Sequence, residues 1–234
     1  SMAKTSDAKA RVYSKYGREI YVCAKAGGLD PSGNLALRSL IDRAKKDQVP
    51  THVIDKAIDK AKGGAGENFE LARYEGYGPG GVAILVETLT DNKNRTVAEV
   101  RHCFSKYGGS LGTNGSVAYL FERTGIISFP EGADEEQIME IALEAGAHDI
   151  TTNEDTSVDV LTTLETFGAV QDALKKAGLE WVNAEMTMLA STHAELDLSG
   201  AESLLKMIDH MEDLDDVQNV YHNGNISDEI AAQL

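Results

Sequence analysis

The spacing of apolar residues changes at a glycine-rich segment, and this change constrains the fold more than any other feature of the sequence. Before residues 63–66, which read Gly-Gly-Ala-Gly, apolar residues from Val12 to Cys23 recur every three or four positions, the spacing of one helix face. After it, short apolar runs such as residues 82–86 have the length of strands and alternate with helical segments. The chain is therefore predicted to begin with helices alone and to continue, after a linker, as α/β structure.

Three short amphipathic helices are predicted before the linker. Their apolar stripes run through residues 12–23, 37–44 and 53–61. Each stripe ends at a pair of residues that stops helices, namely Gly27-Gly28, Val49-Pro50 and Gly63-Gly64. Three such helices with short connections indicate a small helical bundle.

The alternation of strands and helices in the second half of the chain predicts a ferredoxin-like unit. Asp134 with Gln137 resembles a capping box at the start of its first helix, and Gly146 ends that helix. The predicted order is β-α-β-β-α-β, with strands at 126–129, 148–152, 158–163 and 182–189 and helices at 134–145 and 167–177.

A second α/β unit is predicted from the segments on either side. Its elements are an edge strand at 69–74, strands at 82–86, 117–121 and 217–221, and helices at 94–107 and 201–214, with a turn at 123–125. The fold class is α+β: an N-terminal three-helix domain followed by two α/β ferredoxin-like domains, the third inserted into the second. The predicted domains are residues 1–66, 67–130 plus 200–234, and 131–199. Which α/β domain owns the strand at 126–129 is left open.

Charge is divided unevenly along the chain. The whole sequence carries 22 Lys and Arg against 38 Asp and Glu, a net charge of −16. Residues 1–64 nevertheless hold 13 Lys and Arg against 7 Asp and Glu, whereas residues 131–234 hold 3 against 24. The total argues against indiscriminate binding to nucleic acid, but the basic N-terminal segment leaves a directed contact with phosphate open.

No enzyme motif is recognisable, so the chain is predicted not to be an enzyme and to need no cofactor. The glycine-rich run 74–81 lacks the Gly-Lys-Ser/Thr of a phosphate-binding loop and is predicted to be a tight turn between strands. The histidines are scattered, and adjacent His102 and Cys103 would face different sides of a helix, so no metal site is predicted. The two cysteines, Cys23 and Cys103, cannot make a disulfide framework. A run of acids is predicted to form a solvated surface: Asp209, Glu212, Asp213, Asp215 and Asp216.

Residues 90–101 combine amides, hydroxyls and two arginines at a loop-to-helix junction. Such side chains can hydrogen-bond phosphates or base edges. The alternative, which chemistry alone favours, is a local structural role in which Asn94 caps the helix and Arg95 pairs with Glu99 one turn later.

Several runs of residues resemble the YebC/PmpR family over residues 9–229. They are Tyr-Glu-Gly-Tyr-Gly-Pro-Gly-Gly at 74–81, Asp-Asn-Lys-Asn-Arg-Thr-Val-Ala-Glu-Val-Arg at 91–101, Gly-Gly-Ser-Leu-Gly at 108–112 with Gly-Ser-Val-Ala-Tyr-Leu-Phe at 115–121, and Glu-Asp-Leu-Asp-Asp-Val-Gln-Asn-Val-Tyr at 212–221. Residues 49–64 look like the shorter YeeN-type branch. The resemblance implies a helical N-terminal domain and two α/β domains, the last inserted in the second.

The resemblance also implies function. It implies a transcriptional regulatory protein, a non-enzymatic DNA-binding regulator of gene expression. The alternative is a ribosome-associated translation factor or translational activator that eases stalled elongation through rRNA or tRNA contacts, and a third hypothesis is an acidic protein-interaction scaffold. The predicted nucleic-acid-binding residues are Arg11, Lys15, Arg18, Arg43, Lys45, Lys46, Lys56, Lys60, Lys62, Lys93, Arg95, Arg101 and Lys106.

The expected partner is nucleic acid, either DNA or ribosomal RNA, with a basic protein as a further partner for the acidic domain. No run of eighteen apolar residues and no leader-like start are found, so a cytoplasmic protein without a membrane contact is expected. A monomer or weak dimer is also expected. One departure from the family matters. Its members usually open with a basic stretch containing Lys-Trp-Ala-Asn-Ile, whereas this chain opens Ser1-Met2 and has its single tryptophan at Trp181. Either the start is truncated or this member lacks that arm; if the arm contacts nucleic acid in the family, tight binding by this chain is not expected.

Overall fold

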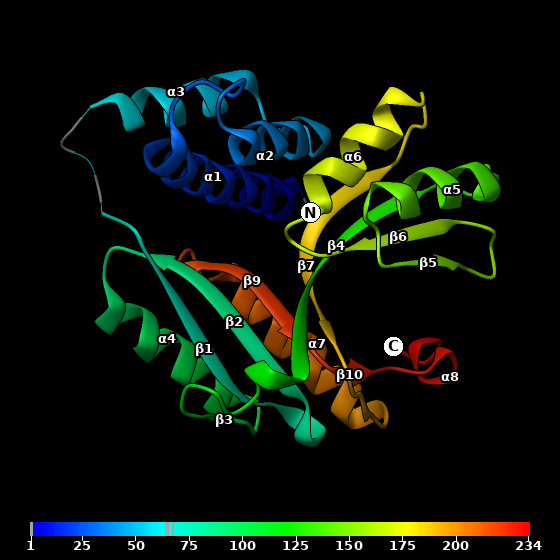
Figure 1. Ribbon diagram of the computed structural model, residues 1–234. Coiled ribbons are helices and arrows are strands. Elements are labelled where there is room, and N and C mark those ends of the chain that lie inside the picture. Colours follow the sequence, from blue (N-terminus) through cyan, green and yellow to red (C-terminus); the bar gives the residue numbers. More distant parts are fainter. Residues whose placement is uncertain (1, 64–65, 67) are drawn as a thin grey trace. The chain divides into compact units, whose positions relative to one another are not determined.

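The structure is a computed structural model that describes residues 2–63, 66 and 68–234. It contains two compact units: the first unit comprises residues up to 120 together with 192–234, and the second unit comprises residues 121–191. Figure 1 shows the elements of both units. The predicted linker at 63–66 lies partly outside the described residues, at positions 64 and 65.

The first unit begins with the predicted helical bundle, called here the helical head. It consists of α1 (Met2–Gly27), α2 (Leu35–Lys46) and α3 (Thr51–Lys62). The helices pack around Ile20, Leu37 and Ile54, which are almost completely buried. Asn34 begins α2, because its side-chain oxygen accepts a hydrogen bond from Leu37 N at 3.1 Å. The prediction of three amphipathic helices is confirmed.

None of the helices among the described residues is long and apolar enough to span a membrane. The longest, α1, carries charged residues along its length.

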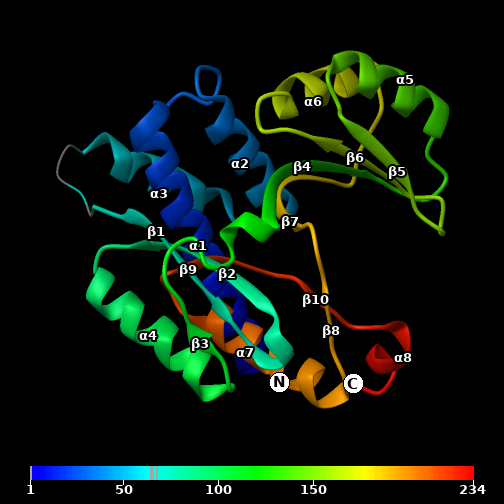
Figure 2. The same cartoon turned by 60° about the horizontal axis from the view of Figure 1, so that its bottom comes forward.

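The rest of the first unit is a four-stranded antiparallel sheet with two helices on one face (Figure 2). In order across the sheet, the strands are β3 (Ser110–Leu111), β1 (Glu70–Tyr77), β2 (Ala83–Thr90) and β9 (Val217–His222). The helices α4 (Lys93–Lys106) and α7 (Leu198–Asp213) pack on this sheet. Their shared core includes Ile84, Phe104 and Met207, all buried.

Two strand predictions in this unit are wrong. The segment predicted as an edge strand at 69–74 is part of the longer strand β1, which lies between β2 and β3. The segment predicted as a strand at 117–121 instead forms the 3-10 helix η2 (Ala118–Leu120), after which β4 (Phe121–Phe129) begins. The edge strand next to β1 is β3, which has only two residues and so carries no alternating pattern to recognise.

Short elements complete the first unit. The tight turn predicted at 74–81 is confirmed for the second half of that run, since residues 74–77 belong to β1. The turn is the 3-10 helix η1 (Pro79–Gly81), in which Gly80 and Gly81 have φ values of 69° and 76°. The strands β8 (Ala194–Glu195) and β10 (Gly224–Asn225) form a small parallel pair. The helix α8 (Asp228–Ala231) follows near the end of the chain.

The second unit is an antiparallel sheet covered by two helices. The strands lie in the order β5 (Asp149–Thr152), β6 (Val158–Thr162), β4 and β7 (Asn183–Ala190), with α5 (Glu135–Ala145) and α6 (Phe167–Lys176) between them in the sequence. The core includes Ile127, Ile138 and Leu174. The connection β-α-β-β-α-β and this strand order are those of a ferredoxin-like fold, as predicted. Asp134 caps α5 and Gly146 ends it with φ of 116°.

The strand at 126–129, whose owner the sequence left open, is part of β4 in the second unit. The predicted turn at 123–125 is wrong, because β4 pairs with β7 without interruption from Phe121 to Ser128. Position 125 of β4 is a glycine because a side chain there would clash. A Cβ would stand 2.2 Å from the Thr162 hydroxyl and 2.4 Å from the Phe167 ring. The boundaries predicted for a third domain, 131–199, stay a prediction.

Candidate nucleic-acid interface

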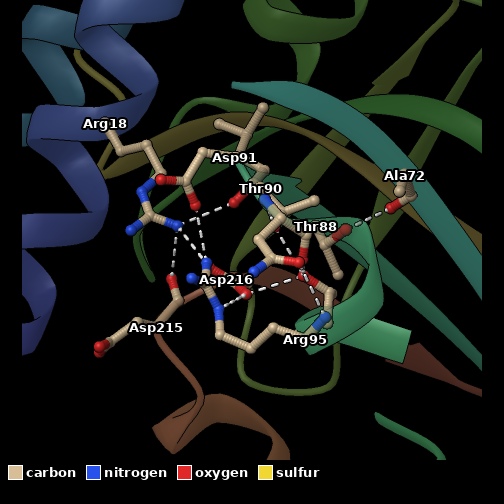
Figure 3. A network of polar contacts seen from close by, with 11 residues as sticks. Arg18, Ala72, Thr88, Thr90, Asp91, Arg95, Asp215 and Asp216 are labelled. Atoms are coloured by element: carbon tan, nitrogen blue, oxygen red, sulfur yellow. Dashed lines mark hydrogen bonds and ion pairs between the residues drawn. The ribbon is translucent and has the colours of Figure 1, made fainter. Parts of the chain in front are cut away.

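The carboxylate of Asp216 is the centre of a polar network in the first unit. This side chain is 2% exposed. Arg95 donates to it through Nε at 3.1 Å and Nη2 at 2.8 Å, Thr96 through its hydroxyl at 2.7 Å, and Arg18 through Nη1 at 3.0 Å. Figure 3 shows Arg18 reaching the carboxylate from α1 and Arg95 from α4, while Asp216 itself precedes β9.

The sequence around the start of α4 positions Arg95 and Thr96 for these contacts. Asn92 caps the helix by accepting a hydrogen bond from Arg95 N at 3.1 Å. The hydroxyl of Thr90, the last residue of β2, accepts from Asn92 N at 2.9 Å and lies 2.6 Å from the Thr96 hydroxyl. The first turn of α4 is therefore held to the end of β2.

The local structural role predicted for this junction is confirmed in kind but wrong in its partners. The cap is Asn92 and not Asn94. Arg95 pairs with Asp91 at 2.8 Å and with Asp216, and its predicted partner Glu99 does not take part. An ion pair with a residue 121 positions away cannot be read from helical spacing.

The ionisation of Asp216 follows from this geometry. Burial by itself would raise the pKa of the carboxyl, but the hydrogen bonds from Arg95, Thr96 and Arg18 outweigh it and hold the pKa below the ordinary value. The same contacts raise the pKa of Arg95. The carboxylate is thus charged at neutral pH, and the prediction that the whole acidic run is solvated is wrong for Asp216.

Arg18 joins α1 to the sheet through further contacts. It donates to Leu89 O at 2.8 Å and to Asp215 O at 3.3 Å. Its guanidinium carbon lies 4.5 Å from the centre of the Phe69 ring, a cation–π distance. Arg18 is therefore engaged within the protein by a carboxylate, two carbonyls and an aromatic ring.

Three more of the predicted nucleic-acid-binding residues are also engaged internally. Arg11 pairs with Asp213 at 2.8 Å, and Lys93 pairs with Glu70 at 2.9 Å. Lys15 donates to the carbonyl oxygen of Glu212. Together with Arg18 and Arg95, these residues are held by contacts within the protein, although the sequence assigned them to an outward basic surface.

The other predicted residues lie elsewhere, mostly on exposed surface. Lys62 is close to Asp59, at 3.6 Å, and the Lys106 ammonium lies 5.6 Å from the centre of the Tyr107 ring. Arg43 is half-buried, and its charge acts on nearby Glu19. The exposed remainder are Lys45, Lys46, Lys56, Lys60 and Arg101. Within the described part of the chain, no ion pair is found for Lys45, Lys56, Lys60 or Arg101.

A buried glutamate explains two of the glycine-rich motifs. Glu75, 4% exposed on β1, accepts hydrogen bonds from the backbone N–H groups of Gly115, Val117 and Ala118 at 2.7, 3.0 and 2.6 Å. These bonds outweigh burial and hold the pKa of Glu75 below its ordinary value. The same loop passes very close to β1, so a Cβ on Gly109 would stand 2.3 Å from Tyr77 O. This cluster is a structural anchor that sequence reasoning missed.

Among the residues that the structure describes, no three His, Cys, Asp or Glu side chains are grouped so as to hold a metal ion. His102 and His210 do approach each other, with ring centres 6.2 Å apart, and the Tyr107 hydroxyl lies 3.2 Å from His210 Nδ1.

Burial raises the pKa of the Cys103 thiol to about 11, so this thiol is protonated at neutral pH.

Two family models match almost the whole chain. The model described as "TACO1/YebC protein N-terminal domain" matches residues 1–64, and the model described as "TACO1/YebC second and third domain" matches residues 69–224. The first boundary agrees with the end of the helical head.

Proteins with similar sequences align with this chain over nearly the full length of both partners. The "Probable transcriptional regulatory protein IL1088" of Idiomarina loihiensis is 54% identical over 97% of this chain and 92% of its own. The "Probable transcriptional regulatory protein YebC" of Salmonella arizonae is also 54% identical, over 97% and 93%. The crystal structure of the conserved hypothetical protein Aq1575 from Aquifex aeolicus matches with a TM-score of 0.82 and 41% identity, over 94% of this chain and 92% of that one. These matches do not separate a YeeN-type branch, which stays a prediction.

Proposed function

Because this chain belongs to the TACO1/YebC family, whose curated relatives are named as probable transcriptional regulatory proteins, we propose that it is a non-enzymatic, DNA-binding regulator of gene expression acting in the cytoplasm. Contact with phosphate is made by the helical head. The acidic remainder of the chain prevents indiscriminate binding.

The observation that carries this proposal is the set of exposed lysines on α2 and α3. Lys45, Lys56 and Lys60 are exposed and have no ion pair among the described residues. By contrast, Arg18 and Arg95 are committed to Asp216. Unpaired lysines on a basic segment supply the phosphate contacts that position a protein on nucleic acid, but they do not read its sequence.

A charge-reversal experiment tests this proposal with a matched control. The full chain carrying Lys45→Glu, Lys56→Glu and Lys60→Glu is titrated against fluorescent duplex DNA and RNA, with binding followed by anisotropy at several salt concentrations. The control carries Lys175→Glu, Lys176→Glu and Lys206→Glu, which reverse the only three Lys or Arg residues of the segment 131–234. Its net charge therefore changes by the same amount as that of the head variant.

We expect the head variant to lose most of its binding and the control to keep it. The slope of log affinity against log salt should fall by up to about 3 in the head variant, because each lost phosphate contact on duplex contributes about 0.9. Equal losses in both variants, or a wild-type affinity that does not depend on salt, would contradict the proposal.

A second candidate function is a ribosome-associated translation factor. It is favoured by the composition of α3, where the exposed acids Asp55 and Asp59 alternate with Lys56 and Lys60. A helix that enters the major groove has phosphates on both sides, and exposed acids beside its lysines would be repelled by those phosphates. Sedimentation of lysate through a sucrose gradient separates the two functions, because a ribosome factor co-migrates with ribosomal subunits and a DNA regulator does not.

A further inference from the structure

A groove of about 420 Å³ lies between α1 and α3 in the helical head. Tyr13 and Gly17 of α1, Val53 of α3, and Phe69 just before β1 line its apolar part. Lys56 and Lys60 of α3 also line it. Its volume is that of a small-molecule site, and its lining combines aromatic rings with positive charges.

The glycine in this groove is not required by packing. Gly17 lies in the interior of α1, where glycine is less favourable than alanine by about 1 kcal/mol. A Cβ there would have only Val53 Cγ1 within 4 Å, at 3.9 Å, which is ordinary contact. The helix α1 therefore keeps a glycine that lowers its stability. Because Gly17 has no side chain, the groove beside it stays open.

Neighbouring side chains hold one aromatic ring of the groove, that of Phe69, in place. Phe69 packs edge-to-face against Tyr21, with ring centres 6.2 Å apart and planes at 86°. Arg18 lies over the Phe69 ring and is itself held by Asp216. Tyr13 is half-buried and lines the groove from α1. The rings of Tyr13 and Phe69 thus offer surfaces against which a planar ligand can stack.

The charges of the groove are sorted by sign. Lys56 and Lys60 lie one helical turn apart and both line it, together with exposed His52. The acids of the same helix, Asp55 and Asp59, are not among the lining residues. A ligand in the groove thus meets cations and aromatic rings, which is the combination that binds unpaired nucleotides: bases stack on the rings and the backbone follows the positive charge.

We propose that this groove binds an unpaired nucleotide of single-stranded nucleic acid, with the base against Tyr13 and Phe69 and the flanking phosphates at Lys56 and Lys60. The inference rests on the proposed function, in which the helical head contacts nucleic acid, and adds that the strand it contacts is unpaired. A base in an intact duplex is stacked inside the helix and cannot enter, so the groove selects single strands, RNA or DNA, over duplex.

Filling the groove without altering charge tests the proposal. Gly17→Ala and Gly17→Leu are made in the full chain, and anisotropy is measured with fluorescent oligo(U), oligo(dT) and an oligo(dA)·oligo(dT) duplex, each of about 12 nucleotides. Lys56→Gln with Lys60→Gln removes the phosphate contacts, and Lys175→Gln with Lys176→Gln, on α6 of the second unit, is the matched charge control.

Stability and binding are expected to move in opposite directions. Gly17→Ala should raise the melting temperature by about 2–4 °C, since it removes a helix-interior glycine. Gly17→Leu should weaken binding of single strands by about 5- to 150-fold, the effect of losing one stacked base. The Lys56→Gln, Lys60→Gln chain should also bind weakly, with a salt slope smaller by about 1.4 on single strands.

The outcomes separate this inference from the proposed function. If Gly17→Leu binds oligo(U) and oligo(dT) like the wild type while the Lys56→Gln, Lys60→Gln chain does not, the groove proposal fails and the proposed function stands. Tighter binding of the duplex than of both single strands also overturns the groove proposal. If the wild type binds none of the three probes, the proposed function fails and the groove proposal fails with it. If Gly17→Leu does not fold, Gly17→Ala is compared with the wild type instead. Its smaller side chain should weaken single-strand binding by less, and unchanged binding would count against the groove proposal.

Discussion

Asp216→Asn is expected to destabilise the first unit by about 3 kcal/mol. The carboxylate accepts four hydrogen bonds, three of them from guanidinium groups. An asparagine keeps the shape but has one oxygen, and its amide would point N–H groups at donors. Removing one partner of a buried ion pair costs about 3–5 kcal/mol. The lower end applies because Arg95 is 42% exposed and can regain water, whereas Arg18, 17% exposed, keeps its bond to Leu89 O.

Chemical unfolding of the full chain measures this effect. Far-UV circular dichroism follows both units, and fluorescence of the single tryptophan, Trp181, reports the second unit, which should not change. The matched control is Asp215→Asn, which alters the same group on an adjacent exposed residue and should stay within about 0.5 kcal/mol of the wild type. An Asp216→Asn chain as stable as this control would refute the network argument.

The pH dependence supplies a second check on the same residue. Because the folded-state pKa of Asp216 lies below the ordinary value of about 3.9, its contribution to stability is present above that pH and is lost as the pH falls further. The difference between the wild type and Asp216→Asn should therefore be constant near neutral pH and shrink below about pH 4. A difference that grows on acidification would show that the carboxyl is protonated in the folded protein.

Three other predictions concern the anchor around Glu75 and the buried thiol. Glu75→Gln should destabilise the first unit by about 2–3 kcal/mol, seen as faster hydrogen exchange in the loop at 113–118, because an amide donor replaces an acceptor of three N–H groups. In urea unfolding, Gly109→Ala should lower the free energy of unfolding more than Gly108→Ala. Only a Cβ at position 109 would press against backbone, whereas position 108 has open space around it and a strained φ of 79°. Equal losses of stability would contradict the close approach of the loop to β1. At pH 8 a thiol reagent should label Cys103 only after unfolding, because its pKa is raised to about 11; rapid labelling of the folded chain would contradict its burial.

Some of the fold could be predicted because its signals are local. Amphipathic spacing identified the three helices of the head and the β-α-β-β-α-β order of the second unit, and each element is long enough to show its period. The segment at 117–121 alternates like a strand, with Val117, Tyr119 and Phe121. It does not pair as one, because Val117 N and Ala118 N donate to Glu75, more than 40 positions earlier, and take no part in a sheet.

The sequence by itself determined that a basic helical segment precedes an acidic α/β chain, because charge counts and apolar periods depend only on the order of residues. Only the tertiary structure decided which of the basic side chains remain available. Arg18 and Arg95 are matched to Asp216 across 198 and 121 positions, a pairing that exists only when α1, α4 and β9 have come together. The same packing of α1 on α3 places Gly17 opposite Val53 and leaves Lys56 and Lys60 beside an aromatic groove, because a cavity is a property of packed surfaces and has no counterpart in an unfolded chain.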